Sequence, residues 1–306
     1  MATNILIRLD CPFIVLKAQR LIKMAYNYET KKGSDYSWLK SIARDIQTIN
    51  RLNSIQRLEG LVKRGVPYSG DNPVFMLQLG NHNLWLRESD AWAAMVLYTE
   101  IFRERDHAAL PGFDGRNSDC IVDLGANIGV YTLKIKENNP ACKILCVEPD
   151  PAMYSLLQRN IDANKIQETT LVNLAVAENN GEISLGTIPE CGGITGKYLG
   201  VIKANSRGWI DPKRIKTIQV RAKSLTSLVQ DYSLSYIDIL KMDVEGMELE
   251  VLKGASPILG KIDKIVLEWH EEGSKNELTR FLKENDFNLL YQEPRAYGNI
   301  YFRKKS

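Results

Sequence analysis

The feature that most constrains the fold is a glycine-punctuated stretch, I-V-D-L-G-A-N-I-G at residues 121–129, followed by I-L-C-V-E-P-D at residues 144–150. Each stretch begins with a short apolar run that reads as a buried strand. The first strand runs into a turn with Gly125 and Gly129, and the second ends at Glu148 before a helix. Glycines let a ligand approach the backbone, and helix N-termini attract negative charge. The pairing is typical of an α/β domain that binds a nucleotide or nucleoside.

From residue 119 onward strands and helices alternate, which predicts a mostly parallel sheet with helices on both faces. Core strands are expected at 121–124, 143–148, 170–175, 237–243 and 264–268, with shorter strands at 182–188 and 218–221. A terminal antiparallel pair is expected at 287–292 and 299–303. Asp150 and Pro151 predict the start of one helix, and Ser274 with Glu277 predicts a capping box for another.

The preceding 118 residues divide into two parts. Residues 1–70 predict a basic helical arm, with twelve Lys and Arg against five Asp and Glu in residues 1–65. A long apolar stripe along the arm must pack on the rest of the chain or on a second copy in a homodimer. Membrane contact through a basic amphipathic helix at 13–28 is the less favoured alternative. Residues 71–118 predict a hairpin at 74–86 and a helix at 89–104 that lead into the α/β domain at 119–306.

Charge and cysteine content exclude several classes of protein. A net charge of +3 is too small to indicate a nucleic-acid or membrane partner, and the aromatic and basic platforms of a nucleic-acid binder are missing. The five cysteines are scattered with no C-x-x-C pair, which favours free thiols in a reducing compartment. No membrane span or secretory signal is evident, so we expect a cytoplasmic protein.

The spacing of the turn separates two kinds of cofactor. Dinucleotide oxidoreductases carry G-x-G-x-x-G, whereas this turn reads D-x-G-x-N-x-G, with Asn127 in place of the second glycine. Asn tolerates positive φ, but its side chain leaves less room for a pyrophosphate. Glu148 can accept hydrogen bonds from both hydroxyls of a ribose. Asp123, inside an apolar strand, requires backbone N–H groups or a ligand ammonium as its partner.

Four motifs in this order resemble the FkbM family of S-adenosylmethionine-dependent methyltransferases: D-L-G-A-N-I-G-V-Y-T at 123–132, V-E-P-D at 147–150, A-V-A-E-N-N-G at 175–181 and L-K-M-D-V-E-G-M-E-L-E-V-L-K-G at 240–254. The resemblance covers about residues 119–270 and does not reach the arm. It implies a class I methyltransferase fold, a Rossmann-like seven-stranded, mostly parallel sheet with one antiparallel strand. It also implies methylation of a hydroxyl on a sugar, glycan or secondary metabolite, with S-adenosyl-L-methionine as cofactor.

The resemblance also implies which residues bind the cofactor. The turn residues would line its methionine and ribose side, Glu148 would hold the ribose, and the end of the third strand would approach the adenine through backbone atoms. The expected cofactor-binding residues are Asp123, Gly125, Ala126, Asn127, Gly129, Glu148, Pro149 and Ala175.

Ionisable residues alternate at the ends of two strands that the implied fold makes neighbours. Lys241, Asp243 and Glu245 end the fourth core strand, and Glu268 and His270 end the fifth. The carboxyl ends of parallel strands are the usual ligand edge of such a sheet. We expect Asp243 or His270 to be the general base, Glu245 and Glu268 to orient the acceptor, and Lys241 to neutralise the acidic residues.

A divalent metal among the acidic residues and His270 is chemically conceivable, but the resemblance does not imply one, so we expect none. The glycine-rich segment 191–216 carries six basic residues and one acidic residue. It is either a lid suited to an acidic or phosphate-bearing acceptor or a solvated loop.

Two alternatives to a methyltransferase stay open at this stage. One is an NAD(P)-dependent oxidoreductase or epimerase, and the other is a non-catalytic scaffold protein that keeps the cofactor-binding fold. The N-P-P-aromatic signature of amino-group methyltransferases is missing after the fourth strand, where M-D-V-E-G stands instead. This favours an oxygen acceptor.

Overall fold

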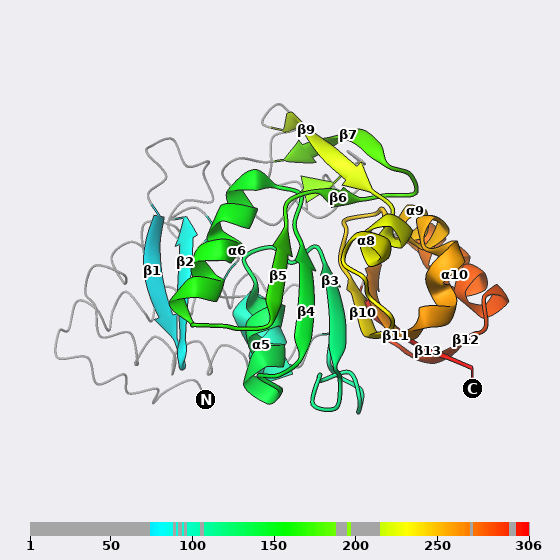
Figure 1. Cartoon of the computed structure of the whole chain (residues 1–306), viewed down its shortest axis with the longest axis horizontal. Helices are drawn as coiled ribbons and strands as arrows, with labels where there is room; N and C mark the ends of the chain where they lie inside the picture. The colour runs from blue at the N-terminus through cyan, green and yellow to red at the C-terminus, as the bar shows by residue number, and fades with distance from the viewer. Residues whose placement is uncertain are drawn as a thin grey trace, which may run out of the picture. The chain divides into compact units, whose positions relative to one another are not determined.

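The computed structural model describes residues 74–87, 90, 94, 97–104, 107–187, 195–196, 215–269, 272–293 and 298–305 (Figure 1). The chain divides into two compact units, Met1–Glu104 and Arg105–Ser306. The predicted helical arm at 1–70, its role in a homodimer and most of the basic segment 191–216 lie outside the described residues. Within the described part, no helix is both long and apolar enough to cross a membrane.

The first unit contains the predicted hairpin. Strands β1 (Val74–Leu79) and β2 (His82–Arg87) pair antiparallel around a turn in which Gly80 has φ 56°. Alternate leucines of both strands are buried, as expected for a hairpin with one apolar face. The helix predicted at 89–104 is described only in part, and its last residues form a π-helix, η2 (Glu100–Glu104).

The second unit is built on a seven-stranded sheet in the order β12-β13-β11-β10-β3-β4-β5 (Figure 1). β13 runs antiparallel to both of its neighbours, whereas the pairs formed by β11, β10, β3, β4 and β5 are parallel. This confirms the predicted class I methyltransferase fold. The strands are β3 (Cys120–Leu124), β4 (Lys143–Val147), β5 (Thr169–Val172), β10 (Ile237–Met242), β11 (Ile262–Trp269), β12 (Phe287–Gln292) and β13 (Gly298–Lys304).

The helices follow the predicted boundaries closely, with one exception. Asp150 caps α6 by accepting hydrogen bonds from the backbone N–H groups of Ala152 and Met153, as its position before Pro151 predicts. The capping box predicted at Ser274 is wrong, because α10 already begins at Glu272 and Ser274 lies inside the helix. The helical segments are α5 (Val130–Asn138), α6 (Pro151–Ala163), α8 (Leu225–Asp231), α9 (Glu248–Gly254), the 3-10 helix η4 (Ser256–Lys261) and α10 (Glu272–Glu284).

A second, four-stranded sheet was not predicted as a unit. Its order is β6-β9-β7-β8, with β6 (Ala175–Val176), β7 (Gly181–Thr187), β8 (Thr195–Gly196) and β9 (Lys216–Lys223). The single strand predicted at 170–175 is therefore two strands in different sheets. The break falls at Asn173, whose side-chain amide donates to the carbonyl oxygens of Glu148 and Pro149 at 2.8 and 3.2 Å. The chain leaves the main sheet there and enters the smaller one at Ala175.

Candidate functional site

The turn after β3 is held against the ends of both neighbouring strands. The backbone N–H groups of Gly125 and Ala126 both donate to the carbonyl oxygen of Val147 at 3.0 Å. Gly125, Asn127 and Gly129 have φ of 73°, 50° and 89°, so Asn127 adopts the positive φ that its residue type was expected to tolerate. A Cβ at Gly125 would overlap the backbone carbonyl oxygen of Asp243, well inside van der Waals contact. The turn therefore needs glycine at this position.

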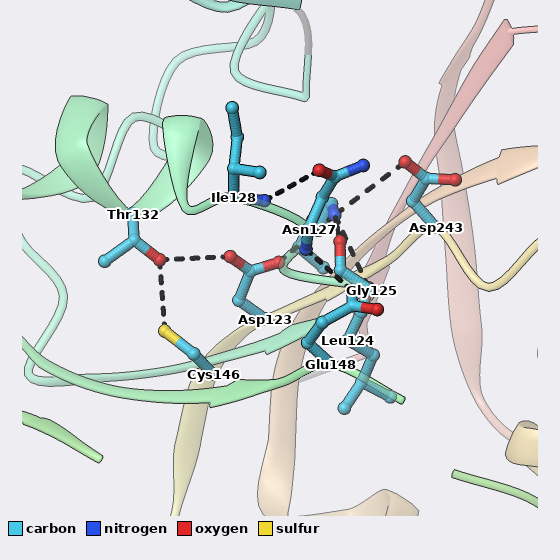
Figure 2. Close-up of polar contacts among 10 residues, drawn as sticks. Asp123, Leu124, Gly125, Asn127, Ile128, Thr132, Cys146, Glu148 and Asp243 are labelled. Atoms are coloured by element: carbon cyan, nitrogen blue, oxygen red, sulfur yellow. Dashed lines mark hydrogen bonds and ion pairs between the residues drawn. The ribbon is translucent and has the colours of Figure 1, made fainter. Parts of the chain in front are cut away.

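Glu148 is fixed at the end of β4 by two backbone hydrogen bonds. One carboxylate oxygen accepts from Asn127 N (Figure 2) and the other from Asp150 N, each at 2.8 Å. The side chain is buried, and burial raises the pKa of Glu148 to about 8 although both N–H groups favour the charged form. Each carboxylate oxygen keeps further acceptor capacity. Glu148 is thus a buried, oriented acceptor at the edge of the sheet.

A pocket opens above the turn, between the main sheet and the smaller one. Its lining includes seven residues that the sequence predicted for the site: Gly125, Asn127, Glu148, Pro149, Ala175, Asp243 and Glu245. The remaining lining is apolar, apart from backbone: Leu124, Val147, Met153, Leu174, Val176, Leu185, Val244 and Met247. A buried carboxylate beside an apolar wall suits a nucleoside, because the acid can bind the ribose and the wall can hold the base.

Asp123 lies below this pocket rather than in its lining. It is fully buried, and its carboxylate accepts from the Thr132 hydroxyl at 3.1 Å (Figure 2). It also forms an ion pair with Lys241 Nζ at 3.1 Å. Lys241 also donates to the carbonyl oxygen of Gly125 at 2.8 Å. The contacts that the structure shows come from the side chains of Lys241 and Thr132. A ligand ammonium near Asp123 stays a prediction from the sequence.

Lys241 remains a cation despite its burial. Desolvation by itself would lower the pKa of Lys241, but the charges of Asp123, Asp243 and Glu268 outweigh it, so the pKa is raised. Its Nζ is 3.9 Å from Asp243 Oδ2. Lys241 therefore ties the turn of β3 to the acidic residues at the end of β10, and its charge is shared among several carboxylates.

The residues that end β10 and β11 come together as the sequence predicted. The two strands pair in parallel, with Met242 opposite Leu267. The residues that follow these two, Asp243 and Glu268, therefore lie at the carboxyl-end edge of the sheet. Asp243 donates its backbone N–H to Leu124 O at 3.0 Å, and its side chain is 26% exposed. Glu245 has φ 51° and lines the pocket with Asp243. We call Lys241, Asp243, Glu245 and Glu268 the strand-end cluster.

One histidine of the site was missed and another lies outside the described residues. Ligand atoms of His107, Asp243 and Glu268 all lie within 4.8 Å of one another. His107 is 2% exposed and comes from the segment before β3, where no strand or motif marks it. Its only signal in the sequence is that the chain has three histidines in all. His270, the predicted alternative base, falls among the residues that are not described.

A family model described as the methyltransferase FkbM domain matches residues 123–289. Methyltransferase sdnD of Sordaria araneosa is 29% identical over 220 residues, covering 64% of this chain and 83% of the relative. The 31-O-demethyl-FK506 methyltransferase FkbM of Streptomyces tacrolimicus is 24% identical over 224 residues, covering 67% and 85%. Hexuronic acid methyltransferase AglP of Haloferax volcanii is 26% identical over 182 residues, covering 59% and 68%. The matched family region contains the turn, Glu148 and the strand-end cluster, whereas His107 precedes it.

Proposed function

We propose that this chain, which belongs to the FkbM methyltransferase family, methylates a hydroxyl oxygen of a sugar, glycan or secondary metabolite. Family membership makes the chain a methyltransferase with S-adenosylmethionine as its cofactor, and the acceptor is the proposed part. Two relatives are named for 31-O-demethyl-FK506 and for a hexuronic acid, which supports a hydroxyl-bearing acceptor. Family membership also disfavours the dinucleotide oxidoreductase and the non-catalytic scaffold.

The observation that carries the proposal is that Glu148 and Asp243 line one pocket from two different strands. Glu148 would accept from the ribose hydroxyls, Gly125 and Asn127 would offer close backbone approach, and Ala175 would approach the adenine. Ala126, Gly129 and Pro149 would shape this binding surface, and Asp123 would support it from below through Lys241. The bound cofactor supplies an activated methyl group on a positively charged sulfur.

Asp243 is the proposed general base. Its side chain lines the pocket and is partly exposed, so an acceptor hydroxyl can reach it, and its backbone is fixed by the hydrogen bond to Leu124. The carboxylate would take the hydroxyl proton as the oxygen becomes bonded to carbon. Lys241, whose Nζ is 3.9 Å from Asp243 Oδ2, would balance part of the negative charge at the site, and Glu245 and Glu268 would orient the acceptor. His270 is the alternative base.

The proposal is tested by following labelled methyl from the cofactor into a fractionated extract of the source cell, with mass spectrometry of the labelled species. An O-methyl group on a sugar or alcohol supports it, and an N-methyl or C-methyl product contradicts it. Once the acceptor is known, Asp243→Asn should lower kcat by about 10²–10⁴-fold with unchanged binding of S-adenosylhomocysteine. Asp263→Asn, the same substitution near the start of β11, is the matched control. If Asp243→Asn and His270→Ala both kept near wild-type turnover, the base assignment would be wrong.

A further inference from the structure

We propose that His107, Asp243 and Glu268 form a binding site for a divalent cation at the edge of the pocket that Glu148 and Asp243 line. One ligand atom from each residue lies within 4.8 Å of the other two. The set combines an imidazole nitrogen with two carboxylates, which is the donor chemistry of a metal site rather than of a solvated acidic surface. Asp243 also lines the pocket, so the cation would lie within reach of the acceptor.

The two carboxylates project from backbone that is held on both sides. β10 pairs with β3 and β11, and Asp243 continues this pattern by donating to Leu124 O. Glu268 lies inside β11 and pairs with Asn299 of β13. Ligands carried by paired strands are positioned more accurately than ligands on loops. Both side chains are only partly buried, so a cation from solvent can reach them.

His107 brings the third ligand from a distant part of the chain, and it too is fixed. The imidazole is 2% exposed, and its ring packs edge-on against Tyr131 of α5 with 6.0 Å between centroids and 87° between planes. The backbone of His107 has φ 57°, a conformation that a residue other than glycine adopts only where the surroundings maintain it. A buried imidazole held beside two carboxylates is the arrangement that a cation would require.

The electrostatics of the site is compatible with a divalent cation. Two carboxylates close together repel each other unless a cation compensates them. Lys241 lies nearer to the fully buried Asp123, at 3.1 Å, than to Asp243, at 3.9 Å. One ammonium therefore serves the carboxylates of both Asp123 and Asp243. A divalent cation between Asp243 and Glu268 would add positive charge between the two carboxylates.

The donor set indicates which cation to use as a probe. Carboxylates suit Mg²⁺ and Mn²⁺, and an imidazole ligand shifts the preference toward Mn²⁺ among these. Octahedral ligands about 2.1 Å from a cation lie about 3 Å apart, so the three side chains would draw together slightly on binding. Three protein ligands leave positions open for water or for the acceptor. The bound cation would select acceptors with two neighbouring oxygen atoms, as sugars have, because such a pair can chelate the cation. This role rests on the proposed function, whereas the site itself does not.

Mn²⁺ binding to the full chain, without cofactor or acceptor, tests the site by electron paramagnetic resonance and calorimetry. One bound Mn²⁺ per chain is expected, and His107→Ala and Glu268→Gln should each weaken binding by about tenfold or more. Glu137→Gln, an exposed acidic residue of α5, is the matched control and should bind as the wild type does. His107→Gln serves if His107→Ala does not fold.

Absence of binding at millimolar Mn²⁺, or equal affinity in wild type and both ligand variants, would overturn the site. Because this measurement needs no methyl transfer, it stays separate from a failure of the proposed function. A second arm compares transfer rates with EDTA and with Mn²⁺ added back. Full activity in EDTA would overturn the role in acceptor binding.

Discussion

Replacing Gly125 with alanine probes the contact on which the site depends, the close approach of the β3 turn to the end of β10. An alanine Cβ would overlap the backbone carbonyl oxygen of Asp243, and φ at this position is +73°. The obstacle is backbone rather than a flexible side chain, and Asp243 is itself hydrogen-bonded to Leu124. Neither strand can move without disturbing the sheet.

Two other glycines provide a graded comparison. Gly129 also has a positive φ, 89°, but its Cβ would meet side-chain atoms rather than backbone: the Cδ1 atoms of Leu157, at 2.7 Å, and of Ile161, at 4.0 Å. Gly260 has neither a positive φ nor any atom within 4 Å of an added Cβ. Alanine at Gly125 therefore tests backbone overlap together with conformational strain, alanine at Gly129 tests mainly conformational strain, and alanine at Gly260 tests the substitution itself.

The expected free energies of unfolding follow from these differences. The left-handed conformation costs alanine about 1–2 kcal/mol, and forcing atoms into an occupied space costs about 1–3 kcal/mol. Gly125→Ala carries both costs at their upper end and should lose about 5 kcal/mol. Gly129→Ala should lose about 2 kcal/mol, chiefly from conformation. Gly260→Ala should be neutral or stabilising by up to about 1 kcal/mol, since alanine restricts the unfolded chain.

Urea denaturation gives these values, and calorimetry with S-adenosylhomocysteine measures the cofactor site in whatever fraction folds. We expect Gly125→Ala to abolish binding and Gly260→Ala to leave it unchanged, with Gly129→Ala between them. A Gly125→Ala protein with wild-type stability and affinity would refute the reasoning, because the turn could not then be packed on the backbone of Asp243.

Two further predictions concern buried charges. Asp123→Asn and Lys241→Met should each destabilise the protein by about 3 kcal/mol, because each leaves a buried charge without its partner. The double variant should lose less than the sum of the two single losses. Additive losses in urea denaturation would argue against a coupled pair. Glu148 has a pKa of about 8 in the folded, ligand-free protein, against about 4.3 in an unfolded chain. The folded state therefore holds a proton that the unfolded state releases, so stability should fall by about 1 kcal/mol per pH unit from pH 5 to 8. Glu148→Gln should flatten that slope, and an unchanged slope would assign it to other groups.

The elements of the sheet could be predicted from the sequence because their signals are local. Apolar runs and turn residues predicted every strand of the main sheet to within a few residues, and Asp150 with Pro151 predicted the start of α6. Asn127 and Glu148 were predicted for the site from their spacing in the motif, and the pocket brings them together. The capping box at Ser274 failed because the same residue pattern also fits the interior of a helix.

The sequence by itself determined the succession of strands and helices along the chain, the glycine turn and the acid that ends β4. These features could be predicted because hydrophobic periodicity and backbone requirements are properties of neighbouring residues. Only the tertiary structure decided which distant groups meet. Lys241 reaches Asp123 because β10 and β3 are adjacent in the sheet, and His107 reaches Asp243 and Glu268 from a segment with no motif. Such contacts depend on the order of strands within the sheet and on packing, which bring together residues far apart in the chain. The chemistry proposed at the edge of the sheet depends on these contacts.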